Sequence, residues 1–109
     1  MNTFSSTPIT IAVAPTTTIL CVIDARQYEY LSVQIENLDP TQTFSGTVQR
    51  RLNSSNDFAN STIPDFAEIP PLGSVVADLD TASAVDIRLI GTMSGAGGDI
   101  RLTARDYRR

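Results

Sequence analysis

Residues 85–105 read VDIRLIGTMSGAGGDIRLTAR and contain Asp-Ile-Arg-Leu twice, once on each side of a glycine-rich segment. In both copies apolar residues alternate with polar or charged ones, which is the two-residue period of a half-buried β-strand. Glycine tolerates backbone conformations that other residues avoid, so the segment between the copies favours a sharp bend. This stretch therefore predicts two strands, each with one buried face, joined by a turn.

We expect these two strands to pair as an antiparallel hairpin. Residues opposite each other in such a pair must face the same side of the sheet, and like charges opposite each other are unfavourable. The register that satisfies both conditions places Asp86 opposite Arg105 and Thr92 opposite Asp99. The GAGG run does not fit a phosphate-binding loop, because a strand follows it where such a loop opens a helix.

The same alternation recurs along the chain, whereas helical periodicity is nearly absent. Further strands are indicated near residues 9–13, 31–36, 44–52 and 75–79, separated by turn residues. Residues 18–24 are almost continuously apolar, which is typical of a strand covered on both sides. We predict one domain over residues 1–109, an all-β antiparallel sandwich of seven or eight strands with jelly-roll or immunoglobulin-like topology.

Two segments are expected to be extended arms. Residues 60–73, NSTIPDFAEIPPLG, contain three prolines, which exclude a regular helix or a central strand. Their apolar side chains, among them Phe66, indicate that this arm lies on a surface, either of its own domain or of a neighbour. Residues 1–8 form an N-terminal arm that can also reach a neighbouring molecule.

Composition argues against several classes of function. The net charge of −4 is unfavourable for nucleic-acid binding. The longest apolar run, at 19–23, is far shorter than the ~20 residues of a membrane-spanning helix, so we expect neither a signal peptide nor a membrane anchor. The chain has no histidine or lysine, and Cys21 lies in the apolar run as a buried thiol. We therefore expect no enzyme activity, cofactor or metal.

The basic residues point instead to protein–protein contact. All 8 are arginine, and five of them lie between Arg88 and Arg109. Arginine is enriched at protein interfaces and lysine is depleted there. On the outer face of the predicted hairpin, Ile90 breaks the alternation among charged residues. With Phe66 from the arm, the expected partner-binding residues are Arg88, Ile90, Arg101, Arg105, Tyr107 and Phe66.

Three segments resemble small virion proteins of tailed bacteriophages of the capsid decoration, or cement, type. They are YEYLSVQIEN at 28–37, GTVQRRLNSSNDF at 46–58, and VDIRLIGT with the glycine-rich turn and DIRLTAR. Such proteins often carry a tryptophan soon after the polar loop, where this chain has Phe58. The resemblance implies a non-enzymatic sandwich, often oligomeric, that is made in the host cytoplasm, binds the major capsid protein on the virion surface and stabilises the head.

Two alternatives remain open from the residues. Tyr28 and Tyr30 would share one strand face and could form a platform for a sugar ring, which would indicate a carbohydrate- or receptor-binding module. A connector or baseplate subunit of a phage tail would have the same kind of sequence as a decoration protein.

Overall fold

The computed structural model describes residues 7–28, 30–60, 66–79 and 85–107, and it confirms the predicted all-β sandwich. Within these ranges no helix is long and apolar enough to cross a membrane. A short 3-10 helix, η1 (Ala25–Gln27), accompanies eight strands: β1 (Ile9–Val13), β2 (Thr18–Asp24), β3 (Tyr30–Asn37), β4 (Phe44–Arg51), β5 (Ala59–Asn60), β6 (Ser74–Leu79), β7 (Asp86–Met93) and β8 (Gly98–Tyr107).

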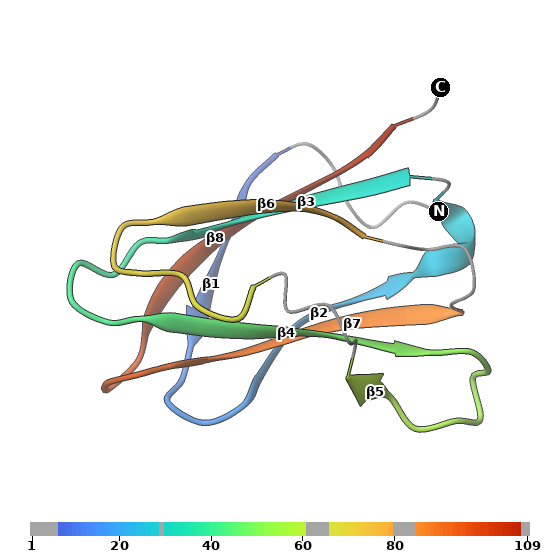
Figure 1. Cartoon of the computed structure of the whole chain (residues 1–109), viewed down its shortest axis with the longest axis horizontal. Helices are drawn as coiled ribbons and strands as arrows, with labels where there is room; N and C mark the ends of the chain where they lie inside the picture. Colours follow the sequence, from blue (N-terminus) through green and yellow to red (C-terminus); the bar gives the residue numbers. More distant parts are fainter. Residues whose placement is uncertain (1–6, 29, 61–65, 80–84, 108–109) are drawn as a thin grey trace.

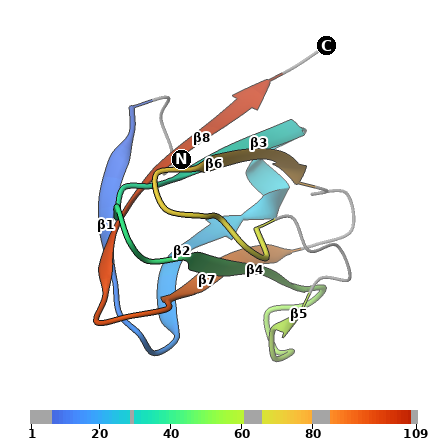
Figure 2. The ribbon, with the colours of Figure 1, turned by 60° about the vertical axis from the view of Figure 1, so that its left-hand side comes forward.

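The strands form two stacked antiparallel sheets (Figures 1 and 2). Sheet A has the order β1-β8-β3-β6, and sheet B has the order β2-β7-β4-β5. The first strand thus pairs with the last, the second with the seventh, the third with the sixth and the fourth with the fifth. Of the two predicted topologies this is the jelly roll, a long hairpin rolled into two layers.

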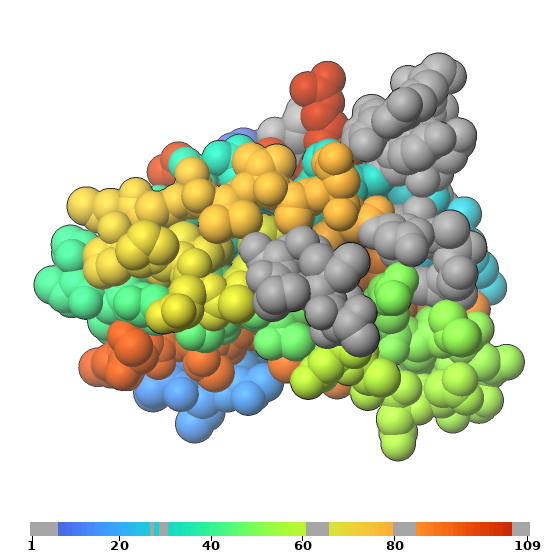
Figure 3. Space-filling view, viewed as in Figure 1, coloured from blue at the N-terminus to red at the C-terminus, as the bar shows by residue number. Residues whose placement is uncertain are grey.

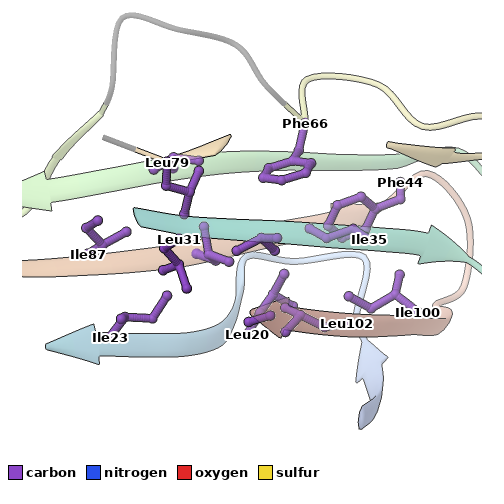
Figure 4. Packing of buried hydrophobic residues seen from close by; sticks show 14 of the residues in the cluster. Leu20, Ile23, Leu31, Ile35, Phe44, Phe66, Leu79, Ile87, Ile100 and Leu102 are labelled. Carbon is purple, nitrogen blue, oxygen red and sulfur yellow. The ribbon is translucent and has the colours of Figure 1, made fainter. Parts of the chain in front are cut away.

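The core lies between the sheets, as the alternation of the strands requires (Figure 4). Ile23 and Ile87 of sheet B and Leu31, Ile35 and Leu102 of sheet A are all fully buried. Burial of an aliphatic side chain of this size contributes about 1.5–3 kcal/mol relative to leaving it exposed. The polar residues between them face outward and form the two outer faces of the molecule.

The predicted hairpin of residues 85–105 is wrong, because β7 and β8 belong to different sheets. Asp86 lies opposite Arg51 and Asp24 in sheet B, and Arg105 lies opposite Ser32 in sheet A. Both strands bury their apolar faces, but they do so against each other across the core rather than side by side. Alternation alone does not distinguish these arrangements, since each strand has one buried face in both.

The glycine-rich segment is therefore a connection between layers, and the side chain of Gln42 holds it in place. The Oε1 of Gln42 accepts hydrogen bonds from the backbone N–H of Gly95 (2.8 Å) and Gly97 (3.0 Å). Its Nε2 donates to the carbonyl of Gly97 (2.7 Å) and to Asp39 Oδ2 (2.9 Å). Gly97 has a φ of 114°, which favours glycine. The glycine-rich segment is thus a bend that is hydrogen-bonded to Gln42 of the same chain.

The described part of the proline-rich arm packs on its own domain. Phe66 and Ile69 are buried, and the backbone of Ile69 exchanges two hydrogen bonds with that of Phe44 in β4 (2.8 and 3.0 Å). Figure 3 shows this yellow segment on the side of the molecule between β6 and β4. β5 pairs with only two residues of β4 and leaves the rest of that edge open. The arm covers part of this open edge through backbone hydrogen bonds of Phe66 with Gly46 and of Ile69 with Phe44. The rest of the predicted arms, 1–6 and 61–65, and residues 80–84 lie outside the described residues.

Candidate interaction surfaces

The structure divides the predicted partner-binding residues between two opposite faces of the sandwich. Arg88 and Ile90 lie on β7 and contribute to the outer face of sheet B. Arg101 and Arg105 lie on β8 and contribute to the outer face of sheet A. The predicted single patch therefore does not exist, and each half has different neighbours.

Two other residues of the predicted site are placed differently. Phe66 has only 1% of its surface exposed and packs in the core, so it cannot contact a partner. The backbone of Tyr107 pairs with that of Tyr30 at the end of sheet A, and both side chains lie outside the described part of the structure. The predicted sugar platform is wrong for Tyr28, which is 6% exposed and belongs to the core.

On sheet B, an aromatic side chain organises the arginines. The guanidinium carbons of Arg88 and Arg51 lie 4.3 and 4.5 Å from the ring centroid of Phe58. Cations at this distance are attracted to the ring by its quadrupole. The Nε of Arg88 donates a hydrogen bond of 2.8 Å to Gln49 Oε1. In the sequence, this cluster is indicated only by the position of Phe58 after the polar loop.

The acidic residues of this face have arginine partners. Asp24 and Asp86 lie opposite each other on β2 and β7, an unfavourable arrangement for two like charges. Arg51 Nη2 lies 2.6 Å from Asp86 Oδ2, and Arg26 Nε lies 3.0 Å from Asp24 Oδ1. These two ion pairs offset the repulsion between Asp24 and Asp86. Among the described residues, Arg88 is then the arginine of this cluster that forms no ion pair with a carboxylate.

An apolar strip, defined as Ile19, Val22 and Ile90, runs beside this cluster. Ile19 and Val22 are 56% and 50% exposed, and Ile19 lies opposite Ile90. The prediction that residues 18–24 are covered on both sides is therefore wrong, because β2 is an edge strand with an open outer face. A bulge between Ile19 and Cys21 turns Ile19 and Val22 outward, away from the core.

The outer face of sheet A is more polar. Arg101 forms a long ion pair with Glu36 (3.5 Å), in which both side chains are partly exposed. Arg105 borders a shallow hollow of about 270 Å³, and Ser32 within it donates a hydrogen bond to Asp78. The hollow is lined by Ser32, Val33, Gln34, Val76, Thr103 and Arg105.

Groups capable of metal binding or nucleophilic attack are sparse in the described ranges. No group of three or more acidic, cysteine or histidine residues there can hold a metal ion. Cys21 is partly buried beside the core, and burial raises the pKa of its thiol to about 12, with a backbone hydrogen bond at Leu89 acting in the opposite direction. The thiol is therefore protonated at neutral pH and a poor nucleophile.

No protein-family model matches the chain, and no curated protein matches it either. A function for this chain is therefore inferred from its residues and their arrangement.

Proposed function

We propose that this chain is a non-enzymatic structural protein of a bacteriophage particle, a capsid decoration protein that binds the outer surface of the head and links neighbouring coat subunits. The observation that carries the proposal is the distribution of arginines. Arg88 lies on the outer face of sheet B, whereas Arg101 and Arg105 lie on the outer face of sheet A. A module with a cationic contact on each of two opposite faces can bridge two acidic neighbours.

The rigidity of the fold supports this role. The proline-rich arm is hydrogen-bonded to β4, and Gln42 ties the connection between β7 and β8 to the loop after β3. Preorganised elements of this kind lose little conformational entropy on binding. Many copies, each with modest contacts to two coat subunits, stabilise a shell through multivalency without any one strong site.

The residues available for chemistry agree with a binding role. The sequence has no histidine or lysine, and the thiol of Cys21 is protonated at neutral pH. The hollow on sheet A is shallow and has Asp78 already bonded to Ser32 on its rim. Partners of the proposed kind are the major capsid protein or other virion subunits, together with further copies of this chain on the particle surface.

Particles assembled without this protein provide the test. We expect them to release their DNA at a lower temperature and to survive treatment with a chelator less well, because the links between coat subunits are missing. Adding purified protein back to such particles should restore both properties. Particles that are equally resistant with and without the protein would refute the proposal, and recovery of the protein on isolated tails would favour a connector or baseplate subunit instead.

A further inference from the structure

We infer that the outer face of sheet B is a docking surface for a partner-protein carboxylate flanked by apolar side chains, with Arg88 binding the carboxylate and the apolar strip contacting its neighbours. The inference rests on the proposed function for the identity of the partner. Its chemistry follows from the residues of this face alone.

Arg88 is held in one orientation by two contacts. Its Nε donates to Gln49 Oε1, and its guanidinium lies over the ring of Phe58. Gln49 is in turn fixed, because its Nε2 donates a hydrogen bond of 2.9 Å to Asn60 Oδ1 on β5. A side chain that is ordered before binding loses less rotamer entropy when it binds.

The end of the Arg88 guanidinium remains available. Its Nε is used by Gln49, and no acidic side chain in the described ranges forms an ion pair with it. The two terminal nitrogens carry four N–H groups in a planar fork that matches the two oxygens of a carboxylate. Such a forked, charge-assisted contact is the arrangement in which arginine binds carboxylates most strongly.

The residues beside Arg88 specify the rest of the partner. Val22 lies directly opposite Arg88 on β2, and Ile19 lies opposite Ile90 in the neighbouring row. Half of the surface of Val22 and more than half of that of Ile19 is exposed. A combination of arginine with exposed aliphatic side chains is typical of the centre of a protein interface rather than of a solvated face.

A second copy joined symmetrically through this face does not supply the required carboxylate. In a symmetric dimer formed through this face, each Arg88 would meet the same face of the other copy. The two acids on the described strands of that face, Asp24 and Asp86, are already paired with Arg26 and Arg51. Extension of sheet B through the β2 edge is also unfavourable, because a bulge interrupts the strand at Leu20. The partner must bring its own carboxylate.

Nuclear magnetic resonance titration of the ¹⁵N-labelled full chain with a blocked Leu-Glu-Val-Glu-Leu peptide tests this inference. We expect shifts of the Arg88 Nε–H and of the backbone amides of Ile19, Val22 and Ile90. Arg88→Gln should weaken binding about tenfold or more, as loss of a charge-assisted hydrogen bond does. Val22→Asn leaves Arg88 in place and should weaken binding several-fold. The matched control on the opposite face, Arg101→Gln, should bind like the unchanged protein.

Several results would overturn the inference. A peptide with glutamine in place of both glutamates that binds equally well would exclude a role for the carboxylate. Shifts confined to sheet A, or none at millimolar peptide, would exclude this surface. Shifts of β2 amides that depend on protein concentration without peptide would assign the face to a second copy. Peptide binding by a protein that does not bind particles would leave the inference intact and refute the proposed function.

Discussion

At the scale of single residues, Asn37 stabilises the loop after β3 from inside the core. It is 1% exposed, its Nδ2 donates to the carbonyls of Gln42, Ile69 and Pro70 at 2.8–3.2 Å, and its Oδ1 accepts from the N–H of Asp39 at 3.0 Å. Asn37→Ala removes the donor of the Gln42 carbonyl and the acceptor of the Asp39 N–H, while the Ile69 and Pro70 carbonyls keep their backbone donors Phe44 and Gly73, so the free energy of unfolding should fall by about 1–3 kcal/mol. Urea denaturation measures the change. Ser45→Ala, on the exposed face of β4, is the control, and equal midpoints for the two variants would contradict this role.

Some residue-level features were predictable and others were not. The alternation at residues 31–36 identified Leu31, Val33 and Ile35 as inward-facing, and all three are buried. Asn37 was predictable only as a turn residue, because two of its partners lie more than thirty positions away in the arm. The exposure of Val22 was not predictable, since an apolar run has the same appearance in an edge strand and in a covered one.

At the scale of elements, two glycines allow β4 and β7 to accommodate an aromatic ring. Gly46 and Gly91 lie opposite each other, and a Cβ on Gly91 would lie 2.4 Å from the ring of Phe44. Gly91→Ala should therefore lower the free energy of unfolding by about 1–3 kcal/mol through overpacking. Combining it with Phe44→Leu should recover part of that loss, which a double-mutant cycle in urea measures. Additive effects of the two substitutions would contradict this packing, and Thr92→Ala on the outer face is the control.

The elements themselves were more predictable than their pairing. Alternation and turn residues located most of the strands, and proline identified the arm as extended. The expected hairpin was wrong because the choice between pairing side by side and packing across the core depends on distant strands. β8 pairs with β1 and β3, and β7 pairs with β2 and β4. The bonds from Gln42 that fix the intervening bend are likewise absent from any local pattern.

At the scale of the whole molecule, the jelly-roll pairing determines which residues can act together. Because β7 and β8 enter different sheets, residues of these consecutive strands such as Arg88 and Arg101 lie on opposite outer faces of the sandwich. The same pairing brings β2 beside β7, which joins Ile19 and Val22 to Arg88. The candidate surface was therefore half predictable: its β7 residues were identified from sequence, and its β2 residues required the fold.

Because the protein has an arginine on each of two opposite faces, we expect both faces to contribute to its attachment to particles. If each face binds a different coat subunit, Arg88→Glu and Arg101→Glu should each weaken retention in part, because the intact face still holds the protein. The double variant should be lost almost completely, and the loss should occur at lower salt than for either single variant. Sedimentation of particles over a range of salt concentrations measures retention, and circular dichroism confirms that each variant is folded. If Arg101→Glu is retained like the unchanged protein while Arg88→Glu alone is lost, attachment uses only sheet B and the protein does not bridge subunits.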